Sequence, residues 1–445
     1  MEPARGALHR VLGVGFGLAI IVGGAVGVGI LRTPGTIAGL VQHAPLIFLA
    51  WGLAGVYALL QANNLAELAA AIPRSGGSYV FARRALGPYG GFLVGWSDWL
   101  ALTVAAAYLP LAFAEYSARL LPVLAGREPQ VAVGALATFV ALQLAGIRSG
   151  SRAQEVVSLV KAVALLAFVA ACFTVPGVSG PAPYAASAAA PATGGVTLVA
   201  FAGALQLVIG AYGGWYSAAF FGEEQTDPGR NIPRALLVGV LFVMAIYLLM
   251  NAAYLHVLPI PELAASTLPA ASAMQRVFGG NSDRLVTALA LVVLLGIVNA
   301  LVMIAPRTLF ALARDGLFFQ CAASVTRGGT PAVATIVTAL VAMALAFSGT
   351  FERLFALTAF LMTSVDAVNT LNVLVLRRRE PGLARPYRAW GAPATTILAL
   401  VASLALLVAF VAADATTALV GIVFMACSYP VYRWITRRSA LTGGA

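Results

Sequence analysis

Gly23-Gly24-Ala25-Val26-Gly27-Val28-Gly29-Ile30 forms the centre of the first long apolar segment of this chain. Four of its first seven residues are glycine, and each glycine inside a helix costs about 1 kcal/mol relative to alanine. We therefore predict that the first helix is interrupted here. A similar stretch, Gly210-Ala211-Tyr212-Gly213-Gly214-Trp215, lies in the middle of the sixth apolar segment. Small residues also allow close helix packing, but two such stretches, one in each half of the chain, favour a binding site.

The composition around these stretches is that of a membrane protein. Of the 445 residues, 61% are hydrophobic and 10% are charged, whereas soluble domains carry about 25% charged residues. Apolar runs of about 20 residues can each cross a bilayer as a helix. We predict an all-α polytopic membrane protein, a single domain over residues 1–445, with twelve spans at 13–41, 45–71, 88–121, 130–147, 153–175, 197–222, 232–257, 284–313, 331–349, 353–376, 392–413 and 416–435.

The charge distribution predicts the orientation of these spans. The chain has 27 basic and 16 acidic residues, a net charge of +11. If the N-terminus is cytoplasmic, 20 of the basic residues fall on the cytoplasmic side and five on the other, as the positive-inside rule requires. We therefore expect a multi-pass protein of the cytoplasmic membrane with both termini in the cytoplasm. The scattered arginines form no basic patch for nucleic acid.

Other compositional signals point to no cofactor. Cys172, Cys321 and Cys427 have neither disulfide nor metal-site spacing, and the three histidines lie near span ends without paired ligands. We predict no metal, no cofactor and no enzymatic centre. The stretch from Pro176 to Gly195, rich in Ala, Pro and Ser, is predicted to be an external loop.

An interrupted helix exposes backbone groups that can bind a substrate. Amides of Val28, Gly29 and Ile30 would lie at a positive helix end and could bind a carboxylate. Carbonyls around Ile21, Val22 and Ala211 could accept hydrogen bonds from an ammonium group, so a zwitterion of amino-acid size suits both. Tyr212 and Trp215 could close over its side chain or could pack as ordinary core aromatics. The predicted substrate-binding residues are Gly24, Val26, Gly27, Val28, Gly29, Ala211, Tyr212, Gly213 and Trp215.

Lys161 is the only lysine in the chain, and it lies inside the fifth predicted span. An ionisable group within the membrane is costly and marks a functional site by default. The alternative is that its side chain extends to the interface beside Arg152. Lys161 lies nine helical residues beyond Arg152, or about 13 Å, which is too deep for the side chain to reach the interface easily. We therefore predict that Lys161 acts in coupling or braces the first helix break.

Five acidic residues in or near the spans are candidate gate or proton groups. Glu67 and the pair Glu223-Glu224 lie at span ends and are expected to form gate or loop ion pairs with Arg74, Arg230 or Arg234. Asp98 and Asp366 lie deeper, in the third and tenth spans. Each could be a proton site or a polar group satisfied inside the bundle.

Several stretches together resemble the amino acid–polyamine–organocation (APC) transporter superfamily, and most closely its L-type and related bacterial exchangers. Gly27-Val28-Gly29-Ile30-Leu31 is similar to the superfamily's Gly-Ser-Gly-Ile-Phe motif. The remaining matches, in the order expected, are 67–79 followed by 91–96, Tyr212-Gly213-Gly214-Trp215 with Glu223-Glu224 and Arg230-Asn231-Ile232-Pro233-Arg234, Pro306-Arg307 with Ala313-Arg314-Asp315-Gly316, and Arg385-Pro386-Tyr387-Arg388.

The resemblance implies a LeuT-type fold of two inverted five-helix repeats, residues 13–175 and 197–376, with two peripheral helices at 392–435. It also implies that Gly27, Val28 and Gly29 contact the substrate carboxylate. It implies further that Lys161, which matches the span 5 lysine of several members, occupies the space where sodium-driven relatives bind an ion, and this argues against sodium coupling.

Two departures from the superfamily pattern concern the site. Val28 replaces the usual serine, which removes a hydroxyl but keeps the backbone amide. Arg32 replaces an apolar residue one turn later, where it could meet an anionic group of the substrate or pair with an acidic neighbour.

The sequence therefore predicts a secondary transporter of amino acids that works by alternating access, by exchange or with protons. An amine or polyamine carrier of the same fold is the alternative, and Asp98 or Asp366 facing the site would favour it. A non-transporting membrane sensor is a further alternative. We expect a monomer or weak homodimer, and the sequence supplies no signal for a partner subunit.

Overall fold

The computed structural model describes residues 8–27, 29–177, 197–266, 268–280, 282–346 and 351–442. Helices dominate these ranges, and isolated bridges join Leu12 to Gln225 and Ser75 to Phe221. The α-helices are α1 (Val14–Ala25), α2 (Gly29–Val41), α3 (Ala44–Ala71), α4 (Ser78–Leu120), α5 (Glu128–Leu144), α6 (Ile147–Cys172), α7 (Leu198–Tyr212), α8 (Pro228–Val257), α9 (Ile260–Ala265), α10 (Pro269–Phe278), α11 (Ser282–Arg314), α12 (Ala332–Ala346), α13 (Phe351–Arg379), α14 (Ala394–Ala413) and α15 (Ala415–Thr442). Short 3₁₀ turns are η1 (Pro122–Leu124), η3 (Ser217–Phe220) and η4 (Gln320–Ala323).

The helices are those of a multi-pass membrane protein. Within the described ranges, eight are long and apolar enough to cross a bilayer, and α1 with α2 forms a ninth candidate that is bent by 44°. The shorter apolar helices α5, α7 and α12 have 15 to 17 residues, fewer than the roughly 20 that a straight span needs. Each of the twelve predicted segments overlaps one of these helices or the bent pair, and the twelve-span topology itself stays a prediction.

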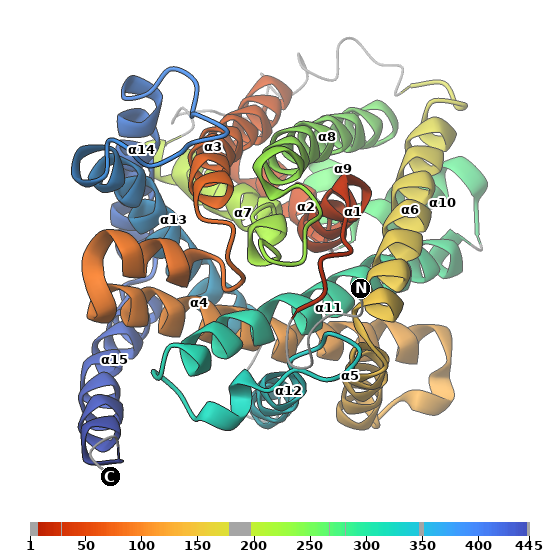
Figure 1. Cartoon of the computed structure of the whole chain (residues 1–445). Coiled ribbons are helices and arrows are strands. Elements are labelled where there is room, and N and C mark those ends of the chain that lie inside the picture. Colours follow the sequence, from red (N-terminus) through yellow and green to blue (C-terminus); the bar gives the residue numbers. More distant parts are fainter. Residues whose placement is uncertain are drawn as a thin grey trace.

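The helices pack in two groups around a central crossing. Helix α3 packs along α8 and α7, and α1 packs against α8 and α6. Helices α4 and α11 cross the middle of the molecule, with α5 and α12 beyond them (Figure 1). Helix α13 packs on α4, while α14 and α15 lie at the periphery (Figure 1). The core is therefore built between α1, α3, α4, α7, α8, α11 and α13.

Helix α4 changes direction near its start. Gly87 has a φ of 85°, a conformation that favours glycine. Pro88 follows it and has no amide hydrogen to continue the helical bonding. The bend folds the first turns back, so that Tyr79 lies against Gly95. This return brings Ser78 close to the deeper part of the same helix.

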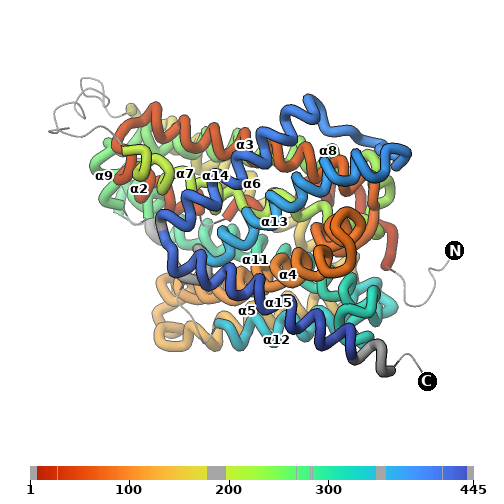
Figure 2. Tube along the Cα trace, turned by 90° about the vertical axis from the view of Figure 1, so that its left-hand side faces the viewer, coloured from red at the N-terminus to blue at the C-terminus, as the bar shows by residue number. Residues whose placement is uncertain are grey.

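The described chain begins and ends at one end of the molecule, and α2 and α9 lie at the other (Figure 2). We name the first of these the basic end. It contains the loop between α3 and α4, the segment before α8 and the C-terminal ends of α11 and α13. The last turn of α13 carries Arg377, Arg378 and Arg379.

Ion pairs tie the basic end together, but not with the partners that we predicted. Glu67 pairs with Arg377 and Arg385, two residues that are far from it in the sequence. Glu223 pairs with Arg314 at 2.9 Å, and Glu224 pairs with Arg307 at 2.6 Å. The expectation of Arg74, Arg230 or Arg234 was wrong because it considered neighbours in sequence, whereas tertiary packing brings the ends of α11 and α13 to these carboxylates.

Arg74 instead faces Asp315 at 3.5 Å, and Arg83 forms a second ion pair with the same carboxylate. Burial raises the pKa of Asp315, but hydrogen bonds from Arg83 and Tyr79 outweigh burial, so that the pKa lies below its ordinary value. The lowered pKa means that Asp315 stabilises this end above the ordinary aspartate pKa, and that the contribution is lost as pH falls through the lowered value.

The Glu224–Arg307 pair is almost fully buried, with side-chain exposures of 0% and 3%. We predict that Glu224→Gln destabilises the protein by about 3–5 kcal/mol, because it leaves a guanidinium buried without its counter-ion. Thermal unfolding in detergent, followed by size-exclusion chromatography, measures this loss. Glu380→Gln is the matched control: its pair with Arg84 is exposed and is worth at most about 1 kcal/mol. Equal melting temperatures for the two variants would contradict the prediction.

Candidate functional site

Two helix interruptions face each other in the centre of the bundle. Helix α1 ends at Ala25 and α2 begins at Gly29, with Val26 and Gly27 between them. Val28, which we predicted to bind substrate, lies outside the described residues. Helix α7 ends at Tyr212, and the chain continues through Gly213 to the 3₁₀ turn η3.

The backbones of the two interruptions are in contact. Gly214 has a φ of 96°, and a Cβ atom placed on it would lie 2.5 Å from the backbone carbon and oxygen of Gly24. Glycine is therefore required at Gly214 both for its conformation and for the space. On the other side, a Cβ on Gly29 would lie 2.9 Å from the Cβ of Ala211. Small residues thus let the two breaks approach directly.

Tyrosines of α8 bind the carbonyls that the breaks expose. The Tyr247 hydroxyl lies 2.8 Å from the carbonyl oxygens of both Ala25 and Ala211. Ala25 is the last residue of α1, and Ala211 is the last but one of α7. Two turns later, Tyr254 donates to the Ile30 carbonyl at 3.0 Å. Both tyrosines are fully buried. Because Tyr247 reaches both helix ends, it links the two interruptions.

Lys161 braces the first interruption from α6. Its fully buried ammonium donates to the carbonyls of Gly23 at 2.9 Å and Val26 at 2.6 Å. Earlier on the same face, Ser158 donates to the Ala19 carbonyl at 2.7 Å. A Cβ on Gly296 of α11 would lie 3.1 Å from the Lys161 Nζ, so glycine there leaves room for the ammonium.

These bonds change the prediction of free carbonyls at Ile21, Val22 and Ala211. The Val22 carbonyl accepts from the Val26 amide, and Ala211 accepts from Tyr247. Residues near a break thus find partners inside the protein, since a buried carbonyl without one is costly. The prediction of a free carbonyl was therefore wrong for Val22 in this conformation, whereas Ala211 shares the single Tyr247 proton with Ala25.

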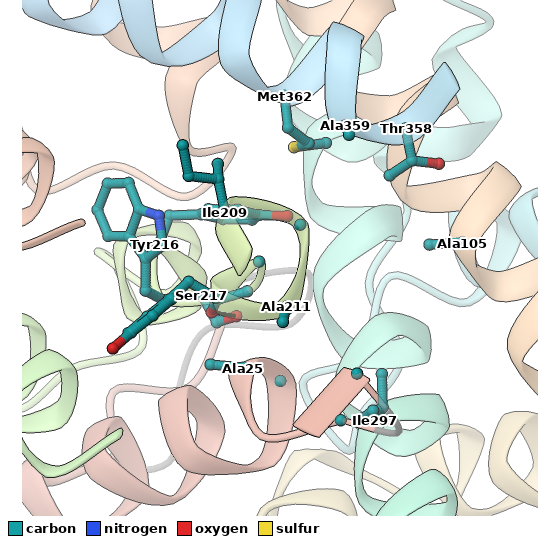
Figure 3. A pocket seen from close by; sticks show the side chains of 18 of the residues that line it. Ala25, Ala105, Ile209, Ala211, Tyr216, Ser217, Ile297, Thr358, Ala359 and Met362 are labelled. Carbon is teal, nitrogen blue, oxygen red and sulfur yellow. Dashed lines mark hydrogen bonds between the residues drawn. The ribbon is translucent and has the colours of Figure 1, made fainter. Parts of the chain in front are cut away.

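A cavity of about 130 Å³ lies at the junction of the two breaks. It is bordered by α1, α4, α7, α11 and α13, with Ala25, Ala105, Ile209, Ile297 and Met362 among its walls (Figure 3). A protein void of about 150 Å³ holds a molecule such as benzene. The cavity therefore has room for a small organic molecule.

Most of the predicted site residues border this cavity. Those that do are Gly24, Gly27, Gly29, Ala211, Tyr212, Gly213, Trp215 and Asp366. Val26 is buried beside it and bonds Lys161. Tyr212 also donates to the Trp51 carbonyl at 3.2 Å, which gives it a packing role. Glu67 belongs to the basic end, and Arg32 is exposed on α2.

Several cavity residues were missed by sequence reasoning. They are aromatic or apolar positions that nothing local separates from ordinary core residues, four inside long helices and Tyr216 in the turn after α7: Tyr57, Tyr108, Tyr216, Ile297 and Met362. Tyr247 was missed for the same reason. A tyrosine in an otherwise apolar span is the one signal that could have found it, because its hydroxyl needs a partner.

A bundle of membrane helices with paired interruptions around an internal cavity defines a polytopic membrane transporter. The family model for amino acid permeases matches residues 17–436, and this chain belongs to that family. Its members are permeases, so the protein is a transporter and not an enzyme.

Transporters from bacteria and from humans match over most of the chain. The serine/threonine exchanger SteT of Bacillus subtilis is 26% identical over 99% of this chain and 100% of its own length. The human b(0,+)-type amino acid transporter 1 is 27% identical over 87% of this chain and 80% of its own length. An uncharacterised transporter of Mycobacterium tuberculosis is 31% identical over 98% of this chain and 94% of its own. These relatives identify an amino acid as the kind of small molecule that such chains move.

Tyr247→Phe removes the hydroxyl that links α1 to α7. We predict a stability loss of roughly 1–2 kcal/mol, together with a larger loss of transport, because the helix ends that border the cavity separate. Thermal unfolding and uptake into proteoliposomes measure the two effects. Tyr429→Phe, on an exposed face of α15, is the control and keeps both properties. Wild-type uptake by the Tyr247 variant would show that the link is dispensable.

Proposed function

We propose that the protein is a secondary transporter that carries amino acids across the cytoplasmic membrane by alternating access, with the substrate at the two helix breaks. The observation that carries this proposal is the position of the cavity. Gly27 and Gly29 border it from the first interruption, and Ala211 and Gly213 border it from the second. A site made of backbone groups suits the carboxylate and the ammonium group that all amino acids share.

The substrate's two charges have complementary places in this site. The amide of Gly29 lies at the start of α2, where the helix dipole favours a carboxylate. The Tyr247 hydroxyl has one proton for two acceptors, the carbonyls of Ala25 and Ala211. One of these carbonyls is therefore always available to an ammonium group, and both residues border the cavity.

Helix packing supports the inverted repeats at 13–175 and 197–376. Under this proposal α3 corresponds to α8, α4 to α11, and the first interruption to the second. Each of these pairs is in contact in the structure. A pseudo-two-fold axis between repeats places equivalent helices side by side in this way, and it leaves residues 392–435 outside both repeats.

The proposed orientation places the basic end in the cytoplasm, where arginine-rich loops are retained. This end is closed in the present conformation. The Val11 and Leu12 amides both donate to the Glu224 carbonyl, at 3.0 and 2.9 Å. The Glu224 side chain binds Arg307 on α11. Inward opening requires the first helix to separate from this segment, so we assign these contacts and the Glu67 ion pairs to the inner gate.

Lys161 supports a sodium-independent mechanism. Its ammonium occupies the space beside the Gly23 and Val26 carbonyls, and a positive charge there repels a metal cation. Driving force then comes from exchange or from protons.

Radiolabelled uptake by the purified protein in proteoliposomes tests the proposal. We expect saturable uptake of at least one L-amino acid, with L-serine and L-threonine tested first because a relative bears their names. Replacing external sodium by choline leaves the rate unchanged, and an internal amino acid or a pH gradient identifies the driving force. No saturable uptake and no exchange across all twenty amino acids would reject the function.

Lys161→Ala removes the brace of the first interruption. We predict at least a tenfold loss of uptake, because the Gly23 and Val26 carbonyls lose their donor inside the membrane. Arg152→Ala, at an exposed position of the same helix, is the matched control with near-normal uptake. If Lys161→Ala keeps both the normal rate and the normal pH dependence, the lysine has no part in coupling.

A further inference from the structure

One carboxylate faces the cavity. Among the described residues that border the cavity, Asp366 of α13 is the only acidic or basic one. The wall around it is rich in aromatic side chains, namely Tyr57, Tyr108, Trp215 and Tyr216. Aromatic faces attract cations through their electron-rich rings. This side of the cavity therefore suits a positively charged group. It adds a carboxylate and aromatic faces to the backbone carbonyls at the helix breaks.

A second carboxylate lies behind the first. Asp98 of α4 is 1% exposed, close enough to Asp366 for electrostatic interaction, and its Oδ2 has no hydrogen-bond partner. Within the described part of the chain, neither aspartate belongs to an ion pair with lysine, arginine or histidine. Two buried carboxylates near one another cannot both stay ionised unless a positive charge joins them.

The groups next to the pair are neutral polar side chains of α3, α4, α13 and the chain after α7. Helix α3 provides Tyr57, whose hydroxyl lies 3.0 Å from Ser403 Oγ and close to Asp366. The start of α4 provides Ser78, which lies close to Asp98. Asn369 of α13 donates to Ser78 at 3.0 Å, while its own Oδ1 has no partner, and Tyr216 approaches from the chain after α7. These neighbours position the two carboxylates and leave their charge to be matched by a ligand.

The pair lies across the cavity from the first helix break. Figure 3 shows Met362 and Ala359 of α13 on the opposite side of the cavity from Ala25 of α1. Asp366 follows Met362 by four residues, hence on the same face of α13. A substrate whose carboxylate lies at the start of α2 would therefore extend its side chain toward Asp366.

We propose that Asp366, backed by Asp98, binds a second cationic group of the transported molecule, so that the preferred substrates are amino acids with a cationic side chain. The proposal rests on the transport function proposed above and adds a substrate class to it. It assigns Asp366 as the residue that contacts the cation and Asp98 as a positioning residue behind it.

Three probes of similar length separate the chemistry: L-lysine, L-norleucine, which lacks the side-chain ammonium, and cadaverine, which lacks the carboxylate. We expect wild-type protein in proteoliposomes to take up L-lysine at least tenfold more efficiently than L-norleucine, and cadaverine poorly. L-lysine should also raise the melting temperature of the detergent-solubilised wild type more than L-norleucine does. This second readout requires no variant.

Asp366→Asn should lower the ratio of L-lysine to L-norleucine uptake at least tenfold, and Asp98→Asn should lower it by a smaller factor. Glu155→Gln, which removes an exposed carboxylate on α6, is the matched control with a wild-type ratio. If a variant does not fold, the inference is tested instead by comparing the melting temperatures of the wild type with L-lysine and with L-norleucine.

The outcomes are distinct. Uptake of L-norleucine or other neutral amino acids without preference for L-lysine overturns this inference and leaves the transport function intact. Equal losses of both substrates in Asp366→Asn, with a flattened pH profile, would make the pair a proton site and also overturn it. Efficient cadaverine uptake without amino acid uptake would keep the cation site but reject the amino acid function. No uptake of any probe or amino acid rejects the function itself.

Discussion

An interrupted helix inside a bilayer leaves backbone amides and carbonyls without their helical partners, and lipid offers none. The rest of this structure depends on how that constraint is met. Two interruptions are placed back to back, with Gly214 against Gly24. Tyr247 serves the ends of both α1 and α7, and Lys161 serves the Gly23 and Val26 carbonyls. The breaks are thus supported by side chains from α8 and α6, and the space left between them is the cavity.

The two ends of the molecule are held by different forces. Near the cavity the bonds are single and involve one donor shared by two carbonyls. At the basic end, bidentate arginine–carboxylate pairs such as Arg307–Glu224 and Arg377–Glu67 join helices that are distant in sequence. Charge-assisted pairs of this kind are stronger and more directional than neutral hydrogen bonds. The basic end is therefore joined by charge-assisted pairs between helices that are distant in the sequence.

The lone lysine and the two buried aspartates inside the bundle lie on opposite sides of the cavity. The positive charge of Lys161 lies beside carbonyls, whereas the carboxyl group of Asp366 lies in the far wall of the cavity among tyrosines, with that of Asp98 behind it. A zwitterion with an additional cationic group would find a complementary partner for each of its charges. The membrane makes such separation consequential, because each uncompensated charge in a low dielectric is expensive.

The sequence by itself determined the membrane class and the positions of both interruptions, and it singled out the lone lysine. These follow from local properties: apolar runs, clustered glycines and one ionisable group where it is costly. Only the tertiary structure decided that Glu67 pairs with Arg377 and Arg385, that Tyr247 joins the two breaks, and that Asp366 borders the cavity. Partners far apart in the chain meet through helix packing, and no local pattern of residues specifies which faces of α8, α11 and α13 turn inward.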